Sequence, residues 1–195
     1  MKRLVSLLFP CMFLCTALLS CRRGADAHLA AHLEALYGRR IVLPDQLVVA
    51  GPEGTLPFSR PAHSAPLSII CYIDSVDCTS CRMSDLMTWY TFDEYVYQRT
   101  PSRPEVMPAV VIATRDTASV NSYVRLFRYD FPILIDTAHR FAALNDLPPE
   151  EVLHTFLLDS EDRIELVGWP FLNDKSIALY RRTIERLVKQ LHEKE

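Results

Sequence analysis

The 195-residue sequence lacks the motifs that identify several large classes of enzyme. It contains no glycine-rich phosphate-binding loop and no nucleophile elbow of a serine hydrolase. Its Cys-x-x-Cys run, Cys78 to Cys81, is followed by Arg82, so the histidine that c-type haem attachment requires is missing. There is no internal repeat or low-complexity tract. With 49% hydrophobic and 23% charged residues, the chain fits one globular domain preceded by an export segment.

The first 20 residues predict an export signal. Lys2 and Arg3 precede the apolar run LVSLLFPCMFLCTALLS, which is short for a membrane span. Because the run ends in Leu18-Leu19-Ser20-Cys21, which has the form of a lipobox, the segment resembles a bacterial lipoprotein signal. The resemblance implies cleavage before Cys21, lipidation of that cysteine, and attachment to the cell membrane or outer membrane, facing the periplasm or the exterior. An uncleaved anchor or an ordinary signal peptide with a chance cysteine is the alternative.

Loss of residues 1–20 would leave a chain poor in cations and in thiols. It would retain 19 basic and 24 acidic residues, a formal charge of −5, which argues against a nucleic-acid partner. With Cys21 lipidated, three thiols would remain, at Cys71, Cys78 and Cys81. One pair and one leftover thiol are too few for a disulfide scaffold, so the Cys-x-x-Cys pair is expected to be redox-active or to bind a metal.

Two regions follow the export signal. Residues 21–59 predict a lipidated N-terminus, a short amphipathic helix over about 26–37 and a linker. The stretch 51–66, which crosses the end of this region, is rich in proline and glycine and is therefore expected to be a loop. His28 and His32 lie four apart on the short helix, which fits a solvated face better than a metal site. Residues 60–195 predict the folded domain.

Apolar runs alternate with amphipathic segments from Leu67 onward. Buried strands are predicted at 67–74, 107–114 and 132–136, each followed by a helix. Asp116 or Thr117 is expected to cap the second helix, and Asn173 or Asp174 the C-terminal helix. Between them, Leu153–Leu158 and Ile164–Val167 flank a polar turn and predict a β-hairpin.

One side of the helix that Cys78 opens is expected to pack on the sheet. Its apolar stripe is Met83, Leu86, Met87 and Tyr90, with Trp89 beside it as core or rim packing.

This order of elements predicts an α/β fold, with a central mixed sheet flanked by helices and an N-terminal extension. With Cys-x-x-Cys at the end of the first core strand, the arrangement resembles the thioredoxin fold. The runs PILID and TFLLDSEDRIELVGWP resemble, more closely, the redoxin-type thioredoxin-like family of the alkyl hydroperoxide reductase-thiol antioxidant superfamily, over residues 60–192. The resemblance implies a thiol-disulfide oxidoreductase that uses protein or small-molecule disulfides and an electron donor, without a cofactor.

Cys78 and Cys81 carry the predicted chemistry. A thiolate attacks in disulfide exchange, and the free N–H groups at a helix N-terminus stabilise its charge. Cys78, just outside the helix, is the predicted nucleophile, and Cys81 is expected to resolve the mixed disulfide. Asp77 opposes thiolate formation by its like charge, and Thr79-Ser80 contains no histidine or proline. The pair is therefore expected to have the potential of a reductant or isomerase rather than of a strong oxidant.

Two positions depart from the pattern of this family. His154 stands directly before TFLLD, where the family has a cis-proline, so a cis peptide is not expected there. Tyr72 stands six residues before Cys78, where thioredoxins have a buried acid, and the nearest acids are Asp74 and Asp77.

The residues before Cys78 differ from those of a peroxidase. In a peroxiredoxin a proline and a threonine precede the peroxidatic cysteine, whereas Cys71 and Ser75 occupy those positions here, so peroxidase activity is not expected. Cys71 itself is expected to be a small core residue rather than a third redox thiol.

His154 has three interpretations that the sequence leaves open. It could relay protons to and from Cys78, or it could join Cys78 and Cys81 as a ligand for copper(I) or zinc, or it could fill the proline position with no further role. Three functions follow: a thiol-disulfide oxidoreductase, a copper or zinc carrier, or a binding module in which the cysteine pair is a structural disulfide.

Overall fold

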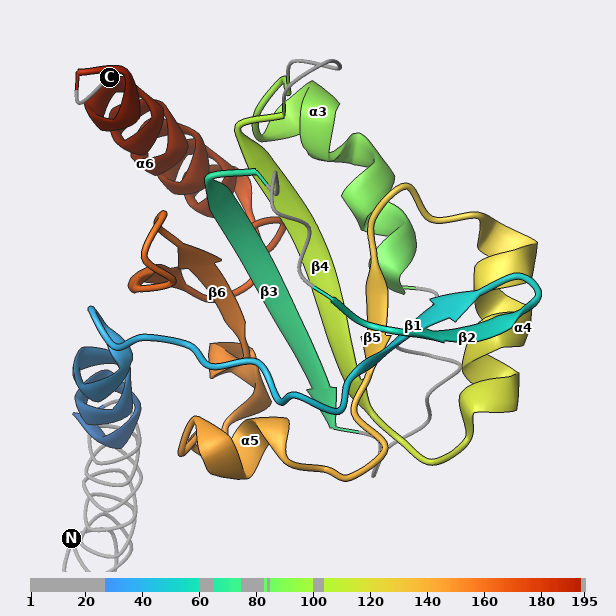
Figure 1. Ribbon diagram of the computed structural model, residues 1–195. Coiled ribbons are helices and arrows are strands. Elements are labelled where there is room, and N and C mark those ends of the chain that lie inside the picture. The colour runs from blue at the N-terminus through green and yellow to red at the C-terminus, as the bar shows by residue number, and fades with distance from the viewer. Residues whose placement is uncertain (1–26, 60–64, 75–82, 84, 100–103, 194–195) are drawn as a thin grey trace, which may run out of the picture. The chain divides into compact units, whose positions relative to one another are not determined.

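The computed structural model describes residues 27–59, 65–74, 83, 85–99 and 104–193 (Figure 1). The chain forms two compact units, Met1–Leu36 and Tyr37–Glu195. In the first unit, residues 27–36 are helical, which confirms the predicted helix there. The predicted export signal and Cys21, as well as Cys78 and Cys81, lie outside the described residues. In the part of the chain that is described, no helix has the length and apolar character needed to cross a membrane.

The second unit is built on a seven-stranded mixed sheet with the order β2-β1-β5-β4-β3-β6-β7 (Figure 1). Its centre consists of three parallel strands: β3 (Leu67–Asp74), β4 (Val106–Ala113) and β5 (Ile133–Ile135). The predicted hairpin is confirmed, because β6 (Thr155–Leu158) pairs antiparallel with β3 and with β7 (Ile164–Val167). The predicted α/β class with a central mixed sheet is therefore confirmed.

The sheet has two further strands on the β5 side. β1 (Val48–Gly51) and β2 (Gly54–Pro57) form a hairpin, and β1 pairs antiparallel with β5. The prediction of a loop over 51–66 is thus wrong for Gly54–Pro57. The two glycines pair with each other at the hairpin end, where Gly54 has a φ of +139° and a Cβ on Gly51 would lie 2.9 Å from the Gly54 oxygen. They serve a tight turn between strands rather than a long loop.

Both faces of β3 are buried, as its continuous apolar run predicts. Ile69, Cys71 and Ile73 belong to the main core together with residues of α6 (Asp174–His192). Tyr72 points to the opposite face, where its ring stacks on Phe141 of α5 (Phe141–Leu144) with 5.1 Å between ring centroids. The strand therefore ends between two packed layers.

From Met83 onward, the described residues pack on the core through a different stripe from the predicted one. After Met83 the chain continues as the 3₁₀-helix η1 (Leu86–Thr91) and the short helix α3 (Phe92–Tyr95). Buried side chains recur every third residue, at Met83, Leu86, Trp89 and Phe92, whereas Met87 and Tyr90 are 40% and 39% exposed. A 3₁₀-helix has three residues per turn, so positions i and i+3 share a face. The prediction assumed the α-helical period and was wrong for Met87 and Tyr90.

Two helix caps are confirmed. Asp116 Oδ1 accepts a hydrogen bond from Ser119 N at 3.0 Å at the start of α4 (Thr117–Phe127). Asn173 Oδ1 accepts from Ser176 N at 3.0 Å at the start of α6. In both cases the side chain satisfies a backbone N–H that has no partner inside the helix.

Candidate functional site

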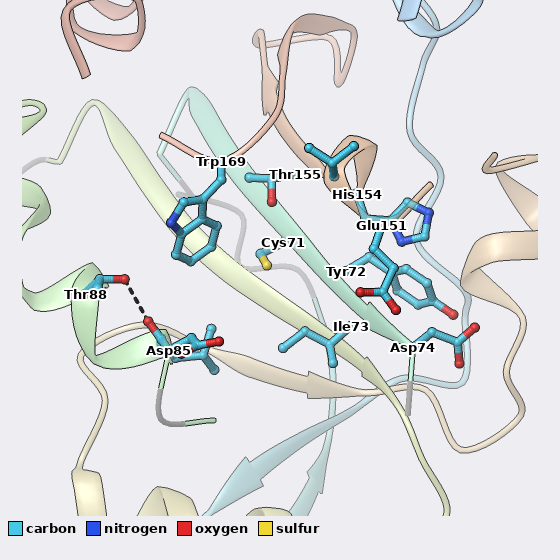
Figure 2. Close-up of a pocket in the computed structure, with 12 residues that line it drawn as sticks. Cys71, Tyr72, Ile73, Asp74, Asp85, Thr88, Glu151, His154, Thr155 and Trp169 are labelled. Atoms are coloured by element: carbon cyan, nitrogen blue, oxygen red, sulfur yellow. Dashed lines mark hydrogen bonds between the residues drawn. The ribbon is translucent and has the colours of Figure 1, made fainter. Parts of the chain in front are cut away.

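A pocket of about 450 Å³ lies at the carboxyl-terminal end of β3 (Figure 2). Four parts of the chain line it: the end of β3, the start of η1, the segment from η2 to β6, and the turn after β7. The lining residues are Cys71–Asp74, then Asp85, Leu86 and Thr88, then Glu151, Val152, His154 and Thr155, and finally Trp169. Cys78 and Cys81 follow Asp74, the last residue of β3, by four and seven residues and precede Met83. The pocket is therefore the candidate site, although both cysteines lie outside the described residues.

His154 is the predicted catalytic residue that the structure describes. It lies between the 3₁₀-helix η2 (Glu151–Leu153) and β6, lines the pocket and is 6% exposed. Its Nε2 lies 2.7 Å from the backbone oxygen of Pro148. Because a carbonyl oxygen only accepts hydrogen bonds, Nε2 carries the ring proton and donates a hydrogen bond to the Pro148 oxygen. Nδ1 has no hydrogen-bond partner among the described residues and, in the neutral ring, holds a lone pair.

The backbone at His154 supports the pairing of β3 with β6. Tyr72 N donates to the oxygen of His154 at 2.8 Å, one residue beyond the registered pair Cys71 and Thr155. No cis peptide bond occurs in the described ranges, so the expectation for His154 is confirmed. The position that belongs to a cis-proline in the resembled family is thus filled by a histidine that follows a trans peptide bond, and the carbonyl oxygen of His154 itself accepts a hydrogen bond from β3.

Tyr72 is a neutral phenol in this wall. Burial, with smaller contributions from the carboxylates of Asp74 and Asp136, raises the pKa of Tyr72 to about 12. Its ring lies 5.4 Å from the His154 ring, measured between centroids. A group with this pKa keeps its proton at neutral pH, so Tyr72 cannot act as the base that a buried acid would provide.

Sequence reasoning missed Asp136, the buried acid of this region. Asp136 is 2% exposed, and its Oδ2 accepts a hydrogen bond from Phe141 N at 2.6 Å, at the start of α5. An aspartate directly after the apolar run PILI was the available signal, because the carboxyl ends of parallel strands meet at one edge of a sheet.

Trp169 was also missed as a wall of the pocket. Its ring packs edge-to-face against Trp89 at 5.3 Å and against Phe171 at 5.7 Å, between centroids. The tryptophan comes from the Gly-Trp-Pro turn after β7, and a large aromatic residue in a turn between apolar elements was the signal. The pocket therefore has a fixed aromatic side.

Cys71 is a core residue, as predicted. It is 7% exposed, belongs to the main core and also lines the pocket. Beside it, burial raises the pKa of Tyr180, whose hydroxyl donates to the oxygen of Gly168 at 2.5 Å. In Figure 2 the sulfur of Cys71 lies between Trp169 and Asp85 on one side and Tyr72 and His154 on the other.

Comparison with known proteins identifies the fold. No family model and no curated protein matches the chain. A solved structure of a candidate protein disulfide isomerase from Bacteroides thetaiotaomicron is 14% identical, covers 80% of this chain and 92% of its own, and has a TM-score of 0.51.

Two further solved structures are similar. The C-terminal domain of a candidate thiol-disulfide oxidoreductase from the same organism is 13% identical over 79% of this chain and 97% of its own, with a TM-score of 0.50. A candidate electron transfer protein from Aquifex aeolicus is 10% identical over 76% of this chain and 97% of its own, with a TM-score of 0.51. Likeness at this level of identity concerns the fold alone. Together with the strand order and the hairpin next to β3, it shows that the chain has a thioredoxin-like fold.

Proposed function

We propose that the protein is a thiol-disulfide oxidoreductase that acts on protein or small-molecule disulfides through Cys78 and Cys81. The observation that carries this proposal is the pocket at the end of β3 in a thioredoxin-like fold. Cys78 follows Asp74, the last residue of that strand, by four residues, and four residues of extended chain span at most about 14 Å. The pocket is thus within reach of the segment that carries both thiols.

The proposed reaction is a two-step thiol-disulfide exchange. The Cys78 thiolate attacks one sulfur of the substrate disulfide, and the other substrate sulfur leaves as a thiolate that takes up a proton. The Cys81 thiolate then attacks Cys78 Sγ and releases the second substrate thiol. The protein pair loses two electrons and becomes a disulfide, while the substrate gains them as two thiols. An unidentified electron donor would restore the dithiol.

His154 is proposed to handle protons in this reaction. Its Nε2 is held by the Pro148 carbonyl, so Nδ1 is the ring atom able to accept a proton from a thiol or from water. Substitution His154→Gln keeps a donor for Pro148 and removes the basic ring nitrogen. This variant is expected to slow exchange near neutral pH and to change the pH dependence of the rate.

Loss of both cysteines tests the proposed function. The Cys78→Ser, Cys81→Ser double variant should fail to reduce a model disulfide, such as 2-hydroxyethyl disulfide, that the wild type reduces. The single variant Cys81→Ser should accumulate a mixed disulfide on Cys78, detected by mass spectrometry. The proposal is abandoned if the double variant reduces the disulfide as well as the wild type.

The proposed location is extracytoplasmic, with a lipid on Cys21. The supporting observation is the lipobox-like run that ends at Cys21 after a short apolar segment. Labelling of cells with a clickable fatty acid should mark the wild type and the control Cys15→Ala, but not Cys21→Ala. Equal labelling of all three proteins would exclude acylation at Cys21.

A second candidate is a carrier of copper(I) or zinc that uses Cys78, Cys81 and His154. The observation that favours it is the state of His154, whose Nε2–H donates to a backbone carbonyl while Nδ1 has no partner within the described ranges. Metal-bound histidines commonly donate their other ring N–H in this way, and two thiolates with one imidazole suit both metals.

Metal titration separates the two candidates. A carrier should bind one equivalent of metal, lose binding in the double cysteine variant, and lose about 10- to 100-fold in affinity on His154→Gln. Disulfide exchange without stoichiometric metal binding would favour the oxidoreductase.

A further inference from the structure

Carboxylates surround the pocket at the end of β3. Asp74 closes β3, Asp85 precedes η1 and Glu151 opens η2, so three separate elements each bring one acid to the same pocket. Figure 2 shows Asp85 on one side of the pocket, and Asp74 and Glu151 on the other. None of the described lining residues is a lysine or an arginine. A pocket with this charge attracts cations and repels anions.

Two of these acids, Asp74 and Asp85, take part in no ion pair within the part of the chain that the structure describes. Asp85 contributes its backbone oxygen, not its carboxylate, to the hydrogen bond from Thr88. In the pocket wall, burial raises the pKa of Tyr72, and the carboxylates of Asp74 in the pocket and of Asp136 outside its lining raise that pKa further. The negative field therefore extends into the wall.

The other walls of the pocket fit a cation as well. Trp169 lines the pocket and is held by edge-to-face contacts with Trp89 and Phe171. An ammonium or guanidinium group gains from the face of a tryptophan as well as from a carboxylate. His154 adds a polar atom, because this side chain is more than nine-tenths buried in the same wall and its Nδ1 has no partner among the residues that the structure describes.

We infer that the pocket selects disulfide substrates that carry a cationic group beside the disulfide, with Asp74 and Asp85 as the specificity-determining residues. The inference rests on the proposed function, because it assigns a substrate class to the same site. The exchange itself is the reaction already described, in which the protein dithiol becomes a disulfide and the substrate leaves as two thiols. The carboxylates bind the charge on the substrate and take no part in electron transfer.

Three small disulfides of different charge test this inference. Pre-reduced full-length protein is mixed with cystamine, which carries two ammonium groups, with neutral 2-hydroxyethyl disulfide, and with anionic dithiodiglycolate, and single-turnover rates are measured by rapid mixing at low salt. Each carboxylate about 6 Å from a unit charge in a water-like dielectric changes the rate about threefold. The Asp74→Asn, Asp85→Asn double variant should therefore react about tenfold more slowly with cystamine.

The rates of the wild type and the variant are compared for one disulfide at a time, so differences in intrinsic reactivity among the three disulfides cancel. The double variant should react with 2-hydroxyethyl disulfide within about twofold of the wild-type rate, and more rapidly than the wild type with dithiodiglycolate. Added salt should weaken the preference of the wild type. The matched control, Asp45→Asn with Glu53→Gln, removes two exposed acids outside the pocket and should leave all three rates unchanged.

The outcomes separate this inference from the proposed function. If the wild type reacts with the neutral disulfide but the double variant keeps the wild-type ratio of rates for cationic and anionic probes, the charge selection is wrong and the oxidoreductase stands. If the wild type reacts with none of the three disulfides, both the proposed function and the selection are wrong.

Discussion

Substitution His154→Ala is expected to destabilise the folded protein by about 2–3 kcal/mol. The side chain is 6% exposed, and its Nε2–H donates to the Pro148 oxygen at 2.7 Å. Loss of this donor leaves a carbonyl without its partner, which costs about 1 kcal/mol. Loss of the ring leaves a cavity next to Tyr72, whose ring centroid lies 5.4 Å away, and adds about 1–2 kcal/mol.

A second variant separates the two contributions. In His154→Gln the side-chain amide can still donate to the Pro148 oxygen, so this variant should recover about 1 kcal/mol of the loss. The exposed His192 near the end of α6 provides a control, since His192→Ala should change the free energy of unfolding by at most about 0.5 kcal/mol.

Urea unfolding of the reduced protein, followed by tryptophan fluorescence, measures these differences. Trp89 is 2% exposed, so unfolding should shift its emission to longer wavelength. A loss below about 0.5 kcal/mol for His154→Ala would refute the packing and hydrogen bond on which the role of His154 depends. A loss of equal size in His154→Gln would refute the contribution of the Pro148 hydrogen bond.

Three further predictions concern the helix caps and the phenol of the pocket wall. Asn173→Ala should destabilise the protein by about 1 kcal/mol in urea unfolding, because Ser176 N loses its acceptor, whereas Asn173→Asp should be close to the wild type. Hydrogen bonds from the Ser119 side chain and backbone lower the pKa of Asp116 in the folded protein. The Asp116 carboxylate therefore stabilises the fold above its unfolded pKa of about 4, and this stabilisation is lost as the pH falls through the lower pKa of the folded state. The difference in Tm between the wild type and Asp116→Ala should therefore be largest above about pH 5 and should shrink below about pH 4; a constant difference from pH 6 to pH 2.5 would contradict the assignment. With a pKa of about 12, only about one Tyr72 phenol in 10⁵ is ionised at pH 7, so Tyr72→Phe should change the rate of disulfide exchange less than about twofold, and a tenfold loss would show that the hydroxyl takes part.

Local patterns in the sequence were sufficient for the core of the fold. The parallel strands, the hairpin of β6 and β7 and the two caps depend on continuous apolar runs and on short-range side-chain bonds, and these signals lie within a few residues. The 3₁₀ geometry of η1 does not follow from composition, because Met83, Leu86, Trp89 and Phe92 become one face only when the period is three.

The second strand of the first hairpin, β2, was assigned to a loop for a related reason. Proline and glycine in the sequence indicate a turn but not its length, and the pairing of β1 with β5 is a long-range contact that only the folded chain reveals.

The place of His154 in the wall of the candidate site was predictable from the sequence, but the surroundings of the site were not. The role of the cysteine pair stays a prediction from its motif, and the acids of the pocket come from elements far apart in the sequence. Asp74 ends a strand, Asp85 starts a 3₁₀-helix and Glu151 belongs to a third element, and only the sheet order brings them around one pocket. A single sequence does not contain that juxtaposition.

The reduction potential of the Cys78–Cys81 couple tests the central proposal most directly. Full-length protein is equilibrated in glutathione buffers of known potential, the thiols are trapped by alkylation, and the peptide that carries both cysteines is quantified by mass spectrometry. The proposal predicts one reversible two-electron couple between about −180 and −270 mV, the range of isomerases and thioredoxins. A pair that stays oxidised in all buffers, or a couple near about −120 mV as in a strong oxidant, would contradict it.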